Sequence, residues 1–237
     1  MQLNSPINSP VESTSDLATA QQWAAEYFSE KNVAKYFLDG EKFIVAHRTV
    51  DSYSFVLTHK PFYGHMYGPS AYLDPRLSEV AIADRELQLL PGFTPSEKFQ
   101  IWEARTAPGK SSLELLEDVD EINALLDEHA PGSSIRPGEK EVVFWAGLRN
   151  SEGVLVACAV VVKWSSGYHV LSSVVTRSEY RGKGLATQLC SEFLSELYSR
   201  GIPTLGLGVR ADNFAAQRAY EKAGFKALAE FTNYSRE

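Results

Sequence analysis

The fold is decided by residues 168–184, which read YHVLSSVVTRSEYRGKG. Residues 168–176 predict a strand, residues 181–184 a tight turn, and Leu185 with Ala186 the start of a helix. Glycine lets the backbone approach a ligand closely and adopt positive φ at little steric cost. A turn that leads into a helix leaves backbone N–H groups unpaired at the positive end of the helix dipole. We therefore expect this turn to bind a phosphate or pyrophosphate, with added positive charge from Arg181 and Lys183.

Two familiar glycine motifs do not fit this turn. A Walker A loop needs four residues between its glycines followed by Lys-Ser or Lys-Thr, and a Rossmann turn needs a third glycine and a later acidic residue. The pattern that fits is Arg-x-x-Gly-x-Ala, formed by Arg181, Gly184 and Ala186. It resembles the pyrophosphate loop of the Gcn5-related N-acetyltransferase (GNAT) family, which binds acetyl-coenzyme A. The alternative is a glycine-rich turn before an ordinary helix.

Composition narrows the class of protein. The chain has 237 residues, 44% of them hydrophobic, enough for one large domain or two small ones. Its net charge of −7 and lack of a Lys/Arg-rich run argue against nucleic acid as the main partner. No apolar run approaches the roughly 20 residues of a membrane span, so no membrane partner is expected. Residues 1–15 are polar and unlike a secretory signal, which predicts a flexible tail on a cytoplasmic protein.

Residues 16–110 predict a smaller α+β lobe without a motif that carries chemistry. Residues 16–30 have the spacing of an amphipathic helix, and residues 42–48 and 53–58 that of a hairpin. Residues 63–69 are aromatic and rich in turn formers, and residues 107–110 indicate a domain boundary. We expect this lobe to help shape the acceptor site; a degenerate repeat of the neighbouring domain and an oligomerisation lobe are the alternatives.

Residues 111–237 have a sharper pattern. A helix is expected from Ser112, which can cap it, through Leu126. Antiparallel strands follow at residues 142–148, 154–163 and 168–176, the second apolar on both faces and therefore central. After the turn come a helix, a strand at residues 205–209 in a parallel crossover, a helix capped by Asp212 or Asn213, and a final strand at residues 225–234.

A second motif makes the resemblance specific. Residues 213–225 match the GNAT pattern Asn-x-x-Ala-x-x-x-Tyr-x-x-x-Gly-Phe, at the usual distance after the pyrophosphate loop. The resemblance covers about residues 111–235 and implies an α/β (α+β) GNAT fold, in which helices flank a mixed, mostly antiparallel central sheet. The catalytic domain would occupy residues 111–237.

The resemblance also implies roles for individual residues. Backbone groups of Val174 and Thr176 would pair with the pantetheine arm, and the N–H of Val175 or Thr176 would polarise the thioester carbonyl. Asn213 would reach the pantetheine or stabilise the helix start, and Tyr220 would protonate the leaving thiolate. The alternative for Tyr220 is an aromatic that packs on the sheet. The backbone N–H groups expected to hold the pyrophosphate are those of Gly182, Lys183, Gly184, Leu185, Ala186 and Thr187, beside Arg181.

The general base is not fixed by the sequence. Many family members carry a glutamate on the strand before the loop, but residues 168–176 contain no carboxylate. His169 on that strand has a suitable pKa, Glu141 lies on the neighbouring strand, and solvent can relay the proton. Cys158 and Cys190 lie in apolar patterns and are expected to be buried free thiols. No metal site is expected, because the five histidines show no ligand spacing with the cysteines.

These observations predict an N-acetyltransferase that transfers the acetyl group of acetyl-CoA to a primary amine by direct attack. The acceptor is expected to be a small-molecule amine or a peptide, and the protein a monomer or homodimer. Two alternatives remain open. One is a non-catalytic module that binds or senses acyl-CoA, and the other is an enzyme that acetylates protein N-termini or lysines.

Overall fold

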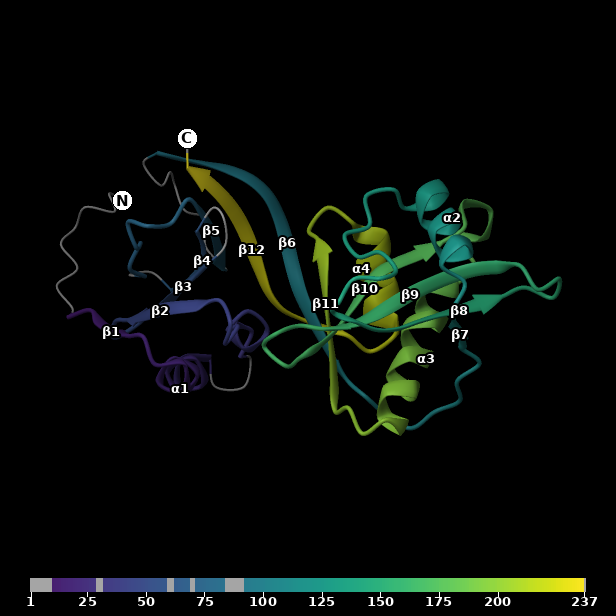
Figure 1. Ribbon diagram of the computed structural model, residues 1–237, viewed down its shortest axis with the longest axis horizontal. Helices are drawn as coiled ribbons and strands as arrows, with labels where there is room; N and C mark the ends of the chain where they lie inside the picture. Colours follow the sequence, from purple (N-terminus) through teal and green to yellow (C-terminus); the bar gives the residue numbers. More distant parts are fainter. Residues whose placement is uncertain (1–9, 29–31, 59–61, 69–70, 84–91, 237) are drawn as a thin grey trace. The chain divides into compact units, whose positions relative to one another are not determined.

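The computed structural model describes residues 10–28, 32–58, 62–68, 71–83 and 92–236. The chain divides into two compact units. Figure 1 colours the ribbon by residue number, so the residues of each unit can be located in it. The N-terminal unit comprises residues 1–100, 210–212 and 228–237, and the C-terminal unit comprises residues 101–209 and 213–227. Strands β6 (Phe93–Arg105) and β12 (Lys226–Arg236) contribute residues to both units. The division therefore falls inside β6, earlier than the boundary expected at residues 107–110.

In the described residues, the N-terminal unit contains helix α1 and a run of paired strands. Its elements are β1 (Glu12–Thr14), α1 (Leu17–Phe28), the 3-10 turn η1 (Ala34–Tyr36), β2 (Phe43–Arg48), β3 (Tyr53–Leu57), β4 (Tyr63–Tyr67) and β5 (Glu79–Ala83). The order is β1-β2-β3-β4-β5-β12, with β4 and β5 parallel and the other pairs antiparallel. The helix predicted from residue 16 and the hairpin of residues 42–58 are confirmed.

Two expectations for this unit need correction. Residues 63–67 form strand β4 rather than a turn, because Gly64 lets β4 lie close to its neighbour: a Cβ there would be 2.5 Å from the Phe55 carbonyl oxygen. The expected tail of residues 1–15 is partly a strand, since Glu12 pairs with Arg48 across β1 and β2 and its carboxylate lies 2.8 Å from the guanidinium. Residues 1–9 lie outside the described part of the chain.

The C-terminal unit has the predicted succession of elements. They are β7 (Glu114–Leu116), α2 (Val119–His129), β8 (Val142–Arg149), β9 (Leu155–Lys163), β10 (His169–Thr176), the 3-10 turn η2 (Ser178–Tyr180), α3 (Leu185–Ser199), β11 (Thr204–Arg210) and α4 (Phe214–Lys222). Strands β7, β8, β9 and β10 are successively antiparallel, and β11 pairs with β10 in parallel. The mixed, mostly antiparallel sheet flanked by helices is confirmed.

Strand β9 is the centre of this unit's core. Its residues from Leu155 to Val162 are all buried, and both α2 and α3 contact it. The apolar run on both strand faces predicted this position, because helices must cover such a strand on each side. Trp102 and Ala104 of β6 belong to the same core as Leu205 and Leu207 of β11. The end of β6 therefore contributes side chains to the hydrophobic core of this unit.

The start of α2 differs from the prediction. Ser112 does not cap a helix, because its hydroxyl and backbone N–H bond the carboxylate of Glu192 on α3. Asp118 caps instead, accepting the N–H groups of Asp120 and Glu121 at 3.0 Å each. Between these points the chain forms the short edge strand β7.

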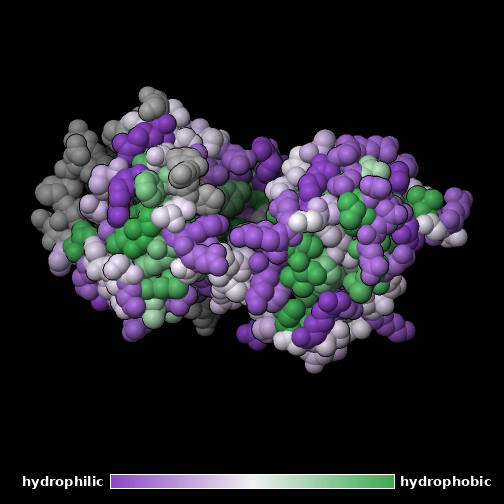
Figure 2. All heavy atoms as spheres, viewed as in Figure 1, coloured by the Kyte–Doolittle hydropathy of each residue, from purple (hydrophilic) through white to green (hydrophobic). Residues whose placement is uncertain are grey.

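The surface of each unit is mixed in polarity. Figure 2 shows hydrophilic side chains over most of the visible face, interrupted by separate apolar patches. Val143 and Leu115 in the C-terminal unit are 43% and 54% exposed. None of the helices in the described ranges combines the length and apolar character needed to cross a membrane.

Candidate active site

A cavity of about 650 Å³ opens within the C-terminal unit, a size typical of small-molecule sites. Four segments line it: the end of α2, the end of β10, the turn that leads into α3, and α4. The predicted site residues that line it are Val174, Val175, Thr176, Arg181, Gly182, Gly184, Leu185, Ala186, Thr187, Asn213 and Tyr220. The fold thus brings residues of both motifs, which are far apart in the sequence, to the wall of the same cavity.

The turn has the geometry that a phosphate cradle needs. Gly182 and Gly184 have φ of 76° and 83°, and a Cβ at either position would meet no atom within 4 Å. Gly184 is the N-cap of α3, and no side chain caps the helix there. The N–H groups of the first turn are therefore available to an anion in the open space beside them.

Arg181 fixes this turn in place. Its Nε donates to the Thr176 carbonyl at 3.1 Å, and Nη2 donates to the His129 carbonyl at 2.7 Å. The guanidinium thus ties the turn to β10 and to the end of α2. Neutral carbonyls leave its positive charge uncompensated, so it still contributes to anion binding at the cradle.

Tyr220 lines the cavity and carries a hydroxyl that stays protonated near neutral pH. The residue is 7% exposed, and within the described part of the chain its hydroxyl has no hydrogen-bond partner. Burial, with a smaller contribution from Cys190, raises the pKa of Tyr220 well above its usual value. Asn213 begins the same helix, accepting the Ala216 N–H at 3.1 Å through its side chain. Tyr220 can therefore donate a proton near neutral pH, while Asn213 stabilises the helix start.

Three candidate residues do not line the cavity: His169, Glu141 and Lys183. His169 lies at the far end of β10, roughly 20 Å from Thr176 along the strand, and is paired across the strands with Lys163. Burial and Lys163 lower the pKa of His169. Glu141 does not line the cavity and lies 3.7 Å from the Lys140 ammonium. Lys183 extends over the ring of Tyr180, with Nζ 4.6 Å from the ring centre.

Strand β10 is irregular where it reaches the cavity. The register against β9 shifts between Ser172 and Val175, and Ser173 has a φ of 48°. The Ser173 hydroxyl donates to the Ile135 carbonyl at 2.9 Å and accepts the Ile135 N–H at 3.3 Å. Ser173 thus fastens the α2–β8 loop to the bulge. The sequence analysis missed this role, since a bulge inside an apolar run leaves no compositional signal.

His129 is a second cavity residue that the sequence analysis missed. Its side chain is 4% exposed at the end of α2, where Nδ1 lies 3.1 Å from the Ser178 hydroxyl. The Ser178 N–H points to the same nitrogen at 3.3 Å. His129 therefore joins α2 to the segment that precedes the turn, and only the fold brings these two segments together.

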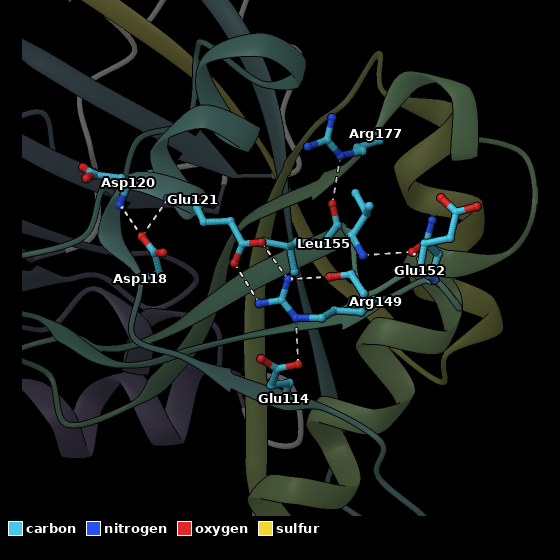
Figure 3. A network of polar contacts seen from close by, with 11 residues as sticks. Glu114, Asp118, Asp120, Glu121, Arg149, Glu152, Leu155 and Arg177 are labelled. Carbon is cyan, nitrogen blue, oxygen red and sulfur yellow. Dashed lines mark hydrogen bonds and ion pairs between the residues drawn. The ribbon is translucent and has the colours of Figure 1, made fainter.

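An ionic network holds the other end of α2 (Figure 3). Arg149 on β8 bonds both carboxylate oxygens of Glu121, at 2.6 and 2.7 Å, and one of Glu114 at 2.8 Å. The guanidinium lowers the pKa of Glu121. Arg177, just after β10, donates to the Leu155 carbonyl at 2.9 Å. These contacts fix α2 and β7 against β8, which positions the cavity wall that ends at His129.

Both cysteines are buried and poorly suited to nucleophilic catalysis. Cys158 and Cys190 are fully buried free thiols. Burial raises the pKa of each thiol to about 12, so neither forms a thiolate readily near neutral pH. Neither lines the cavity.

Comparison with known proteins identifies the family of the C-terminal half. Residues 110–225 match the family model described as Acetyltransferase (GNAT) family. The chain is 38% identical over 64 residues to [ribosomal protein bS18]-alanine N-acetyltransferase of Escherichia coli K12, covering 27% of this chain and 43% of that protein. It is 39% identical over 59 residues to N-alpha-acetyltransferase 30 of Schizosaccharomyces pombe, covering 25% of this chain and 38% of that protein. The chain thus spans less than half the length of these curated relatives.

The fold agrees with a solved structure as well. A GCN5-related N-acetyltransferase from Sphaerobacter thermophilus has a TM-score of 0.58 over 98% of this chain and 96% of that chain, at 17% identity. At that identity the likeness shows the fold alone. Taken with the family match, residues 110–225 form a GNAT acetyltransferase domain in the C-terminal half of the chain.

Proposed function

We propose that the protein transfers the acetyl group of acetyl-CoA to a primary amine by direct attack. The observation that carries this proposal is the meeting of three features around one cavity: the amide cradle of residues 182–187, the end of β10 and the Tyr220 hydroxyl. The cradle suits the pyrophosphate, and the strand end suits the extended pantetheine. GNAT family members use acetyl-CoA, which supports this assignment of the cradle.

The chemistry needs one new bond and one departing thiolate. The amine nitrogen attacks the thioester carbonyl, whose oxygen is stabilised by backbone N–H groups at Val175 or Thr176. The tetrahedral species then collapses, and Tyr220 protonates the departing sulfur. The buried, protonated cysteines favour this direct route over an acyl-enzyme. None of the described residues that line the cavity is Asp or Glu, and we assign the amine proton to solvent.

The names of the relatives suggest the acceptor. One is named for acetylating an alanine of a ribosomal protein, and another is an N-alpha-acetyltransferase. We therefore propose the free α-amine of a peptide as the leading acceptor, ahead of small amines. The second candidate is a module that binds acyl-CoA without turnover.

The test measures free thiol released from acetyl-CoA by the full chain with three kinds of acceptor. These are peptides with a free N-terminus, the same peptides blocked at the N-terminus but carrying a lysine, and small primary amines. Release that requires a free N-terminus supports the leading acceptor. Tight binding of acetyl-CoA without release in any arm would instead identify a binding module. Failure to bind acetyl-CoA would contradict both candidates.

A further inference from the structure

The cavity has a charge pattern opposite to that of the whole chain. The chain carries a net charge of −7. Among the described residues that line the cavity, none is Asp or Glu, whereas three carry permanent positive charge: Arg181, Arg218 and Lys222. Such a cavity attracts a polyanion, and three cations exceed what one pyrophosphate cradle of backbone amides requires.

The three cations are not equivalent. Arg181 is held at the cradle by the carbonyls of Thr176 and His129, so its place is fixed beside the first anion site. Arg218 and Lys222 come from α4 instead. They are four residues apart, which puts them on the same side of the helix, one turn from each other. This outer row of α4 also contains Ala215, which lines the cavity too.

The outer row of α4 lies next to the cradle. Thr187, in the first turn of α3, donates its hydroxyl to the Ala219 carbonyl at 3.3 Å. That contact joins the helix that begins at the cradle to the stretch of α4 between Arg218 and Lys222. The two cations therefore lie on the part of α4 that contacts the start of α3, beside the cradle.

Neither cation is neutralised by the protein. Within the described ranges, Arg218 and Lys222 form no ion pair or side-chain hydrogen bond, and Glu221 beside them pairs with neither. Two like charges four residues apart on a helix repel each other, which favours a shared anion. By contrast, Arg200 and Arg210 elsewhere in the chain each pair with a carboxylate.

We propose that Arg218 and Lys222 form a second anion subsite, which recognises the 3′-phosphate of coenzyme A. Coenzyme A carries this phosphate monoester on its ribose, close to the pyrophosphate, and the monoester is a dianion near neutral pH. A guanidinium and an ammonium from one helix face suit such a group. This inference rests on the proposed function, since it assigns part of the same ligand. The subsite would make the protein prefer coenzyme A to 3′-dephospho-CoA.

The experiment compares the binding of coenzyme A and 3′-dephospho-CoA to the full chain by isothermal titration. The variants are Arg218→Gln, Lys222→Gln and the double substitution. The matched control is Lys226→Gln, an exposed lysine nearby that does not line the cavity. We expect the wild-type protein and the control to bind coenzyme A about tenfold more tightly than the dephospho form. The double variant should bind both ligands with the affinity that the wild-type protein has for 3′-dephospho-CoA.

Each other outcome counts against the inference. Equal affinity of the wild-type protein for the two ligands would overturn it, as would full discrimination by the double variant. Equal weakening of both ligands would assign the cations to the pyrophosphate and overturn it as well. In all three cases binding itself survives, so the proposed function stands. Failure of the wild-type protein to bind either ligand would overturn the proposed function and this inference together. Unchanged melting of the ligand-free variants shows that each one folds.

Discussion

The two units differ in where they place their polar groups. In the described part of the chain, the polar or charged residues that are buried as a whole lie in the N-terminal unit: Asp39, His47, Ser52, Ser54, His65 and Asp74. The C-terminal unit has a core of aliphatic and aromatic residues, and polar groups such as Arg181 and Asn213 line its cavity. The comparison teaches that a buried polar group is not in itself a sign of a site. What matters is whether the group faces open space or another group of the protein.

His47 illustrates the point. Its Nε2 lies 3.1 Å from an Asp74 carboxylate oxygen, and its Nδ1 lies 2.8 Å from the Ser13 hydroxyl. Yet Arg76 binds the same carboxylate through two contacts and lowers the pKa of Asp74. Burial lowers the pKa of His47. The cluster is satisfied within itself, whereas the Tyr220 hydroxyl and the amide cradle face a cavity.

The largest expected effect is at the cradle. Valine at Gly184 would bring a branched side chain into the open space beside the amides, at a φ of 83° that strains any residue with a Cβ. We expect Gly184→Val to weaken acetyl-CoA binding by at least about a hundredfold and to abolish the rise in melting temperature that the ligand gives the wild-type protein. The measurement is melting with and without saturating acetyl-CoA.

The matched control for that substitution is Gly167→Val. Gly167 has a φ of 89° and open space around its Cβ position, but it lies in the β9–β10 hairpin outside the cavity lining. It therefore suffers the same backbone strain without touching the ligand. A folded Gly184→Val protein that binds acetyl-CoA normally would remove the cradle assignment.

The next effect tests the interior of the N-terminal unit. His65 is fully buried against Phe37 and Phe55, and burial lowers its pKa to about 3. An unfolded histidine titrates near 6.5, so between these values the unfolded chain binds more protons than the folded one. The contribution of His65 to the free energy of unfolding is therefore complete above the unfolded pKa, and it is lost as the pH falls from there towards the folded pKa. At pH 5 the loss due to this residue is about 2 kcal/mol.

His65→Phe should remove this pH dependence, since phenylalanine keeps a ring in the aromatic stack and cannot be protonated. The measurement is the free energy of unfolding from urea titrations at pH 7.5 and pH 5, in the wild-type protein and in the variant. The difference between the two pH values should shrink by about 2 kcal/mol. His169→Gln, at a partly exposed histidine of the C-terminal unit, should shrink it less. An unchanged difference in His65→Phe would contradict the prediction.

The comparison of units also explains what the sequence could predict. The C-terminal unit was predictable because its signals are local: glycines before α3, Asn213 before α4, and an uninterrupted apolar run in β9. These features specify turns, caps and burial without knowledge of distant contacts. Most of the residues named from the two motifs line one cavity, whereas His129 and Ala130 at the end of α2 belong to neither motif.

The remainder depends on contacts that the sequence does not encode locally. Ser112 does not cap α2, because it bonds the carboxylate of Glu192, which lies 80 residues away in the chain. Residues 63–67 contain turn formers, but close packing on β3 makes them a strand. Trp102 and Ala104, which precede the expected boundary at residues 107–110, pack in the core of the C-terminal unit. Removing residues 1–106 would therefore take two residues out of that core.

A smaller effect is expected for the proton donor. Tyr220→Phe keeps the ring and its packing and removes only the hydroxyl. Acid–base assistance is worth roughly 10²–10⁴-fold, and we expect turnover to fall by at least about tenfold, while affinity for acetyl-CoA changes little. Single-turnover measurements isolate the chemical step. Tyr198→Phe on α3, at a tyrosine 50% exposed, is the matched control. Wild-type turnover in the Tyr220 variant would show that Tyr220 is a packing residue.

The smallest effect is expected at Ser173, which holds the α2–β8 loop to the bulge of β10 through two hydrogen bonds to Ile135. Ala130, in the same loop, lines the cavity. We predict that loosening the loop impairs the acceptor more than acetyl-CoA, because the cradle and Tyr220 are held by other contacts. Ser173→Ala should raise the KM for the acceptor about fivefold, in line with the loss of about 1 kcal/mol of hydrogen bonding.

Two further substitutions separate the hydrogen bonds from backbone strain, since Ser173 has a φ of 48° that alanine tolerates poorly. Ser173→Gly removes the strain and the hydrogen bonds together, so it should behave like Ser173→Ala. Ser173→Asn tolerates this backbone conformation and offers both a donor and an acceptor, so it should restore part of the acceptor affinity. Ser172→Ala, one residue earlier on the same strand, controls for general disturbance of β10. Wild-type kinetics in Ser173→Gly beside an impaired Ser173→Ala would show that strain, rather than the link to Ile135, limits the alanine variant. The bulge would then owe its geometry to β10 alone.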